Sequence, residues 1–262
     1  MEKASDELRR VIYEDYPPPR LFAVVTWGCA ATDWLAYSLN ECPGIFCLHA
    51  ANYLWNKFAG AGWLSGLDYL EVVGMQGHAA IAAGDVHGVS RADIPEITRK
   101  YGDSFRAAVV VRDPLPRLRS QLGLFKRYGQ FGGWDLTYLQ SMFPEVIDRL
   151  PTGSHEELLF LHGVNMLNAI VEEVAVGPVF RMEDITTDRQ RLAEMIRHLT
   201  GGAVEPAEHW LQSAVASRGT NPHTSKGSEF PGWQLDVLRR VVRPEAVELY
   251  RQLGYNVKNP LM

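Results

Sequence analysis

The clearest chemical signal in the sequence is a loop of small residues between an apolar run and a helical pattern. The run Leu21–Trp27 is β-branched and apolar, and Gly28-Cys29-Ala30-Ala31-Thr32-Asp33 separates it from the helical stretch that begins at Trp34. A loop of this kind points backbone N–H groups and the positive end of a helix dipole at one spot, which suits an anion. The loop holds no Lys or Arg, however, and Asp33 adds a negative charge. The sequence therefore predicts an anion-binding turn with altered chemistry.

A second candidate site begins at Arg112. The run Phe105–Val111 is continuous, short and β-branched, which is typical of a buried parallel strand, and Arg112 follows it directly. Ser120 stands eight residues after Arg112, in the helix predicted next. Arginine supplies the fixed bidentate donor that a phosphate needs, and a serine hydroxyl adds another donor. The alternative is an ordinary ion pair of Arg112 with Asp113 or Glu183.

A histidine in a tight turn is the candidate proton acceptor. His87 lies within Gly84-Asp85-Val86-His87-Gly88, and a histidine titrating near neutral pH suits the removal of a proton from a hydroxyl. Asp85 stands two residues earlier and would share a strand face with His87, so it either orients the imidazole or acts as the base itself. A structural histidine in a glycine turn is the alternative interpretation, and His78 and His49 are further candidates for the base.

The elements that must position these residues alternate between strands and helices. Short strands are predicted over 21–27, 79–83, 105–111 and 179–181, a helix over about 188–200 closed by Gly201-Gly202, and a terminal helix over 233–253. This alternation predicts an α/β fold with a mostly parallel sheet and ligands at the carboxyl ends of the strands. We expect residues 1–20, with Pro17-Pro18-Pro19 near their end, to form an N-terminal segment, and residues 21–262 to form a single domain.

Composition narrows the class of protein. The 262 residues are 46% hydrophobic and 22% charged, which is enough for the core of an α/β domain. A net charge of −5 without a basic block argues against nucleic acid as a partner. No apolar run approaches the roughly 20 residues that span a bilayer, and the charged first residues are unlike a signal peptide. We therefore expect no membrane partner and a cytoplasmic location. The cysteines Cys29, Cys42 and Cys47 lack metal-ligand spacing, so no metal is expected.

Four segments, in order, resemble the motifs of the sulfotransferase family, which moves a sulfuryl group from PAPS to an acceptor. Thr26–Trp34 resembles the family's strand-loop-helix motif, and Arg112 and Ser120 keep the spacing of its second motif. Arg181–Ile185 resembles the third, a strand end before a helix, and Ser225-Lys226-Gly227 followed by Trp233 resembles the last. The resemblance covers most of residues 21–255. It implies a P-loop-like sulfotransferase fold, with a central five-stranded parallel sheet flanked by helices.

The resemblance also implies where each part of PAPS binds. The residues implied are Gly28, Cys29, Ala30, Ala31, Thr32 and Asp33 for the 5′ end, and Arg112, Ser120, Lys226 and Gly227 for the 3′-phosphate. Trp34 resembles the residue that stacks on adenine, and ordinary core packing is its alternative. His87 lies near the position of the family's base. The aromatic residues between Tyr53 and Tyr69 indicate an apolar or aromatic small-molecule acceptor, unless they are core.

The resemblance breaks down at the charged residue of the loop. The family's loop Lys donates to the departing oxygen, and Cys29 stands there instead. A neutral thiol is a weak donor, and losing one such donor costs on the order of 10²–10³ in rate. Three interpretations follow. A cation from elsewhere, Lys57, Arg20 or Lys226, replaces the Lys and the protein transfers a sulfuryl group to a hydroxyl; or the fold serves another reaction; or the protein only binds its ligand.

Rival chemistries match fewer residues. A thiol at a helix N-terminus is easily ionised, but the Arg that a cysteine-phosphatase loop needs six residues after Cys29 is Leu35. The string Asp85-Val86-His87-Gly88 resembles the first metal motif of calcineurin-like phosphoesterases, but the sequence lacks that family's other motifs. The first loop also lacks the Gly-Lys-Ser/Thr of a Walker-type kinase.

Overall fold

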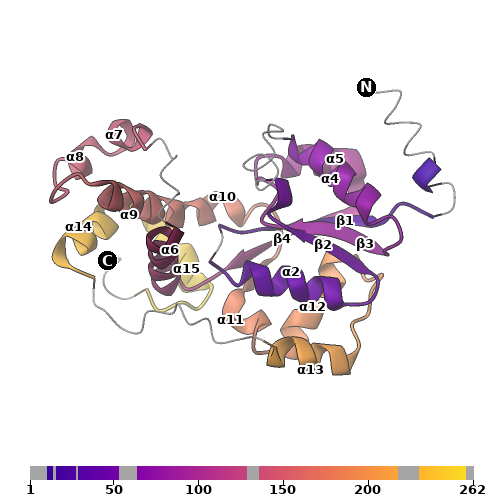
Figure 1. Cartoon of the computed structure of the whole chain (residues 1–262). Helices are drawn as coiled ribbons and strands as arrows, with labels where there is room; N and C mark the ends of the chain where they lie inside the picture. The colour runs from indigo at the N-terminus through magenta and orange to yellow at the C-terminus, as the bar shows by residue number, and fades with distance from the viewer. Residues whose placement is uncertain are drawn as a thin grey trace. The chain divides into compact units, whose positions relative to one another are not determined.

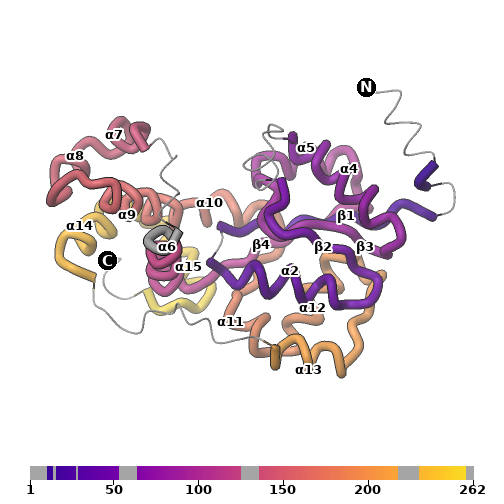
Figure 2. Tube along the Cα trace, in the orientation of Figure 1, coloured from indigo at the N-terminus to yellow at the C-terminus, as the bar shows by residue number. Residues whose placement is uncertain are grey.

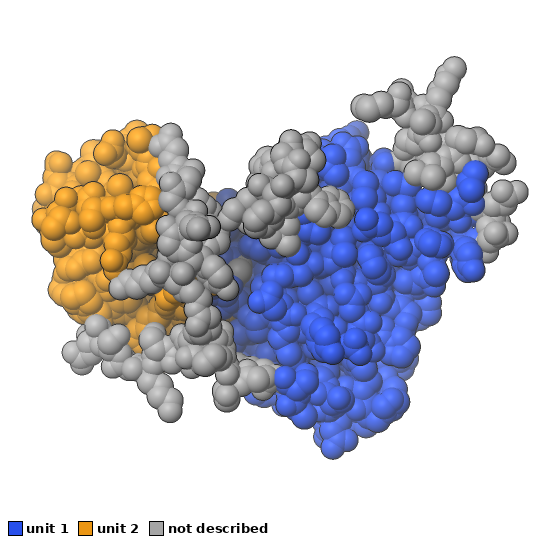
Figure 3. All heavy atoms as spheres, in the orientation of Figure 1, with its two compact units in different colours: residues 1–111, 173–219 blue, residues 112–172, 220–262 orange. Residues whose placement is uncertain are grey.

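The chain forms two compact units in the computed structural model, which describes residues 11–13, 16–27, 29–52, 64–128, 136–217 and 230–257. Unit 1 comprises Met1–Val111 and Glu173–Gly219, and unit 2 comprises Arg112–Glu172 and Thr220–Met262. Figure 3 colours them blue and orange. The single domain over 21–262 remains a prediction.

Unit 1 is built on a five-stranded, all-parallel sheet. The strands are β1 (Arg20–Val25), β2 (Ile45–His49), β3 (Ala82–Val86), β4 (Phe105–Val111) and β5 (Val179–Arg181), in the spatial order β2-β3-β1-β4-β5. Val24 of β1 is in register with Val86 of β3 and Ala108 of β4. The loops after β1, β2 and β3 therefore leave the sheet at one edge, its carboxyl edge. The predicted α/β fold with a central parallel sheet is confirmed.

Helices cover both faces of this sheet (Figure 1). The helices α2 (Thr32–Glu41) and α12 (Arg189–Leu199) pack on one face, and α4 (Gly66–Gln76) and α5 (Ile94–Tyr101) pack on the other. The short elements η1 (Gly102–Ser104) and α11 (Met182–Ile185), with α13 (Glu208–Ala216), complete the unit. Figure 2 shows α12, from the later part of the chain, beside β1, from its indigo beginning.

Strand alternation explains which face each side chain meets. Successive strand residues point to opposite faces, so Phe22 and Val24 enter the core beneath α2, where Leu35 and Leu39 are fully buried. Asp85 is in register with Ala23, one residue out of phase with Val24. Its side chain consequently belongs to the face covered by α4.

Unit 2 is helical in the part that the structure describes. Its helices are α6 (Pro114–Tyr128), α7 (Tyr138–Met142), α8 (Pro144–Ile147), α9 (His155–Asn165), η2 (Met166–Ala169), α10 (Ile170–Glu173), α14 (Gly232–Val241) and α15 (Pro244–Gln252). A capping box formed by Ser154 and Glu157 begins α9, since each side chain satisfies a backbone N–H of the first turn. Phe160 meets the ring of Trp233 edge-on at 5.2 Å between centroids.

Several predicted boundaries differ from the observed ones. The strand expected over 79–83 lies at Ala82–Val86, and β2 is a strand that the sequence did not reveal. The expected terminal helix is two helices, because Pro244 starts α15 and holds Arg243 in an extended conformation. The helix predicted over 188–200 is confirmed as α12, and the glycines after it have the expected left-handed φ of 57° and 77°.

Candidate active site

The loop between β1 and α2 has an unusual backbone at the carboxyl edge. Cys29 and Ala31 have φ of 52° and 55°, in the left-handed region that non-glycine residues rarely adopt. Each such residue costs roughly 1–2 kcal/mol. Thr32 begins α2 and is buried, and the Leu35 amide donates to the Ala31 carbonyl at 2.9 Å. A left-handed turn at a helix N-terminus is a backbone arrangement suited to an anion. Gly28 lies outside the described residues.

Asp33, the unexpected acid of this loop, is paired with a histidine. Its Oδ1 lies 2.8 Å from Nδ1 of His49, the last residue of β2. The hydrogen bond from His49 is the largest cause that lowers the Asp33 pKa, and the charges of His49 and His87 act in the same direction. The Asp33 side chain is 91% exposed, so the pair contributes little to stability. The pairing places the negative charge of the loop against His49.

His87 is fixed to the same loop. Its backbone is left-handed with a φ of 76°, and its amide donates to the Val24 carbonyl at 3.0 Å. The ring Nδ1 is hydrogen-bonded to the Thr26 carbonyl. A carbonyl oxygen only accepts, so Nδ1 carries the hydrogen and Nε2 of the neutral ring keeps its lone pair. His87 lies beyond the end of β3, so the expectation that Asp85 shares its strand face does not apply.

Asp85 is buried in β3 on the face of α4. Its Oδ2 accepts hydrogen bonds from the Tyr69 hydroxyl at 2.5 Å and from the Ala51 amide at 3.5 Å, and the side chain is inaccessible to solvent. A Cβ on Gly88 would lie 2.3 Å from Oδ1, so only glycine fits beside the carboxyl. Burial raises the pKa of Asp85 to about 7, against the smaller lowering effects of Tyr69 and of the Ala51 and Gly88 amides.

This burial predicts a pH-dependent stability. The folded protein keeps the Asp85 proton up to about pH 7, whereas the unfolded chain loses it near pH 4. Stability therefore falls as the pH rises from about 4 to about 7, by at most about 4 kcal/mol from this group. Asp85→Asn should remove that part of the slope, measured by urea unfolding at several pH values. Asp103→Asn, at an exposed position, should keep it; equal slopes for Asp85→Asn and the unmodified protein would contradict the prediction.

Of the candidate cations proposed from sequence, Arg20 is not brought to the loop. Arg20 begins β1 and donates to the Asp103 carbonyl at 3.3 Å. The loop follows the other end of β1, and at about 3.3 Å per residue the strand separates the two by roughly 15–20 Å. Lys57 and Lys226 lie outside the described residues, as do Gly227 and the aromatic positions between 53 and 63.

Trp34 is held by the core of unit 1. Its indole N–H donates to the Ala214 carbonyl of α13 at 3.1 Å, and its ring packs against the buried cluster beneath the sheet. These contacts account for an aromatic residue at this position by packing alone. Stacking of Trp34 on adenine remains a prediction.

Unit 2 holds the second predicted group of residues. Arg112 follows β4 directly, and Ser120 lies on α6; both are more than nine-tenths buried. Sequence reasoning missed Arg117, which stands three residues before Ser120 on the same helix and is 6% exposed. Residues three apart share a helix face, and the Nη2 of Arg117 has no hydrogen-bond partner in the structure. A buried N–H donor is costly without an acceptor, so this face of α6 suits an anion.

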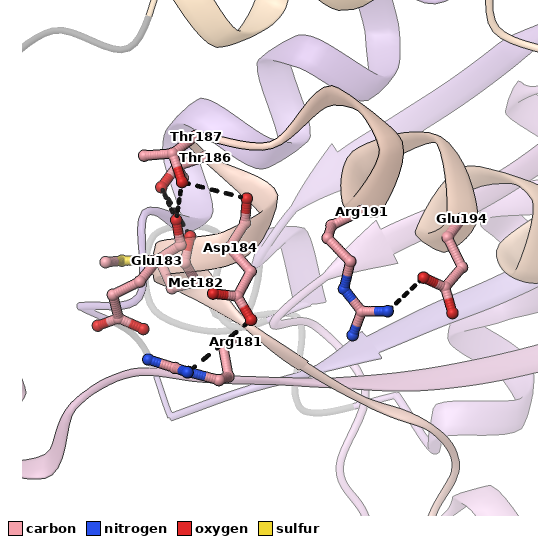
Figure 4. Close-up of polar contacts among 8 residues, drawn as sticks. All are labelled: Arg181, Met182, Glu183, Asp184, Thr186, Thr187, Arg191 and Glu194. Atoms are coloured by element: carbon pink, nitrogen blue, oxygen red, sulfur yellow. Dashed lines mark hydrogen bonds and ion pairs between the residues drawn. The ribbon is translucent and has the colours of Figure 1, made fainter. Parts of the chain in front are cut away.

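The third motif forms a turn from strand to helix (Figure 4). Arg181, which ends β5, lies 3.8 Å from Asp184 between Nε and Oδ2, and Thr186 and Thr187 donate to the Met182 and Glu183 carbonyls at 2.7 Å and 2.6 Å. Arg191 and Glu194 on α12 form a further ion pair in the same view. These contacts stabilise the turn itself. The fourth motif, Ser225-Lys226-Gly227, lies outside the described residues.

The rest of the described chain carries a surface pocket and no metal cluster. The pocket, of about 550 Å³, lies between α12 and α13, and each charged residue of its lining is in an ion pair: Arg189 with Glu208, Glu194 with Arg191 and Arg197 with Glu205. Among the described residues no group of three His, Cys, Asp or Glu side chains could hold a metal ion. None of the described helices is long and apolar enough to cross a bilayer.

Comparison with known proteins gives a likeness to solved structures alone. No protein-family model matches the chain, and no curated protein matches it. Among solved structures it is similar to a sulfotransferase from Alicyclobacillus acidocaldarius, at 14% sequence identity and a TM-score of 0.49, over 91% of this chain and 97% of that one.

Proposed function

We propose that this protein is a sulfotransferase that moves a sulfuryl group from PAPS to a hydroxyl of a small organic acceptor. In this proposal the loop from Gly28 to Asp33 binds the 5′ end of PAPS, and Arg112 and Ser120 bind its 3′-phosphate, with Arg117 as a further donor. Lys226 and Gly227 contribute to the 3′ side by resemblance alone. An apolar or aromatic acceptor is part of the same proposal.

The observation that carries the proposal is the bond between His87 and Thr26. Thr26 is the first residue after β1, where the anion-binding loop begins. Sulfuryl transfer needs a proton acceptor close to the transferred group, because the acceptor hydroxyl loses its proton as its oxygen bonds to sulfur. The bond to Thr26 holds a basic nitrogen beside a loop suited to the anion.

The proposed reaction involves the donor, the acceptor hydroxyl and His87. The acceptor oxygen attacks sulfur, and the bond between sulfur and the bridging oxygen of the donor breaks, which leaves PAP. The acceptor proton passes to Nε2 of His87. Left-handed backbone at Cys29 and Ala31 and the first turn of α2 offer N–H groups to the charge that develops on the departing oxygen. Asp85 contributes by filling the space beside Gly88, in the turn that carries His87.

Calorimetric titration with PAP and with AMP tests the donor. If Arg112 and Ser120 bind the 3′-phosphate, PAP should bind at least about 100-fold more tightly than AMP, because charge-assisted hydrogen bonds are worth roughly 1.5–3 kcal/mol each. Equal affinity for the two nucleotides, or no binding of either, would remove PAPS from the proposal. PAP binding without PAPS-dependent sulfation of any hydroxyl in an acceptor screen would favour the alternative, a protein that only binds the nucleotide.

A further inference from the structure

Arg91 lies against the anion-binding loop of unit 1. Its guanidinium carbon is 5.2 Å from the ring centroid of Trp27, within the range of a cation–π contact. Trp27 stands in the loop between β1 and α2, immediately before Gly28. A fixed cation therefore lies beside a loop whose own sequence contains none.

The topology of the sheet explains this proximity. Arg91 follows β3, and Trp27 follows β1. These two strands are parallel neighbours, with Val86 of β3 in register with Val24 of β1. The turn that carries Arg91 is held by hydrogen bonds from the Asp93 amide to the Ser90 carbonyl at 3.0 Å and from the Ile94 amide to the Arg91 carbonyl at 3.3 Å. These bonds fix the backbone that carries Arg91 in the turn before α5.

Trp27 offers an unsatisfied donor at the same place. Its Nε1 is inaccessible to solvent and has no hydrogen-bond partner in the structure. Buried tryptophan N–H groups normally find an acceptor, and leaving one without a partner costs roughly 1–3 kcal/mol. An oxygen atom of a bound ligand would satisfy it. A cation over the ring and a donor at its edge suit an oxyanion.

The carboxyl groups of Asp33 and Asp85 have partners of their own. The Asp33 carboxylate is paired with His49 at 2.8 Å, and the Asp85 carboxyl accepts from Tyr69 on the α4 face. The ring of His87 is bonded to Thr26. The pairing of Asp33 reduces its repulsion of an incoming anion. The positive charge of Arg91 adds to the attraction of the left-handed turn at Cys29 and Ala31 for that anion.

We propose that Arg91 and the indole N–H of Trp27 together bind the 5′ oxyanion of the nucleotide donor. Arg91 thereby supplies the positive charge that the loop lacks at Cys29. This assignment rests on the proposed function, and it adds a residue from the loop after β3 to the donor site. The charge of Arg91 also opposes the negative charge that grows on the departing oxygen, so it acts on rate as well as on affinity.

The experiment compares two ligands that differ only in the 5′-phosphate, PAP and adenosine 3′-phosphate. Arg91→Ala should weaken PAP binding by about 10–100-fold, as the loss of one charge-assisted contact predicts, and leave adenosine 3′-phosphate binding unchanged. Trp27→Phe keeps the ring beneath Arg91 and removes only the N–H, so a loss of about 10-fold, again for PAP alone, is expected. The matched control is Arg99→Ala, whose side chain is 82% exposed on α5.

Turnover provides the second measurement. With PAPS as donor, Arg91→Ala should lower kcat by about 10²–10³-fold, Arg91→Lys should retain part of it, and Arg99→Ala should be indistinguishable from the unmodified protein. If Arg91→Ala fails to fold in a thermal melt, Arg91→Lys and Trp27→Phe decide by the same ligand comparison. If none of these variants alters PAP binding, the assignment of Arg91 and Trp27 is overturned, and the proposed donor is not. A lack of PAP binding by the unmodified protein would overturn the proposed donor and this assignment with it.

Discussion

Replacing His87 with alanine should lower the rate of PAPS-dependent sulfation by about 10²–10⁴-fold, the usual worth of a general base, with almost no change in PAP affinity. The reason is geometric. Nδ1 is committed to the Thr26 carbonyl, so the ring reaches the acceptor through Nε2, and the base acts on the acceptor hydroxyl and not on the nucleotide. The measurement is kcat and PAP affinity for the same preparation.

Controls separate catalysis from backbone strain. His87 has a φ of 76°, and asparagine tolerates this region while offering an amide N–H to Thr26. His87→Asn should therefore fold as the unmodified protein does and still be inactive. His78→Ala, in the turn before β3 where Nδ1 lies 3.0 Å from the Met75 carbonyl, should retain activity. Turnover near normal in His87→Asn, together with inactivity of His49→Ala, would move the role of base to the Asp33–His49 pair.

The second large effect is expected at Arg112. Arg112→Ala should weaken PAP binding by at least about 100-fold, because two charge-assisted hydrogen bonds to the 3′-phosphate are lost together. AMP, which lacks that phosphate, should bind the variant and the unmodified protein alike. Calorimetric titration with both nucleotides measures the effect. Arg112→Lys should recover only part of it, since an ammonium cannot reproduce the bidentate geometry.

Neighbouring positions sharpen this test. Ser120→Ala should produce a smaller loss of PAP affinity, about 10-fold, and Arg117→Ala should reveal whether the buried guanidinium of α6 shares the phosphate. Arg106→Ala serves as the control, because Arg106 lies on β4 and pairs with Asp103 of η1 at 3.3 Å. Equal losses for PAP and AMP in Arg112→Ala would mean that Arg112 supports the fold and does not bind the 3′-phosphate.

Local sequence patterns determined much of this protein. The β-branched run Phe105–Val111, the proline that begins α6 and the paired glycines after α12 predicted elements that the structure contains. Such signals act within a few residues, through backbone sterics and side-chain packing on one element. For the same reason the sequence located the loop between β1 and α2 and placed Ser120 on a helix after Arg112.

Contacts between distant residues were decided only by the tertiary structure. Position 84 of β3 requires glycine, because a Cβ there would lie 2.3 Å from the Phe22 carbonyl. Strand propensity does not predict this, since glycine is a poor strand former. Asp33 with His49, Tyr69 with Asp85 and Trp27 with Arg91 each join residues at least 16 positions apart. Their proximity follows from strand order and register, which set the neighbours at the carboxyl edge, and register depends on burying one face of every strand at once.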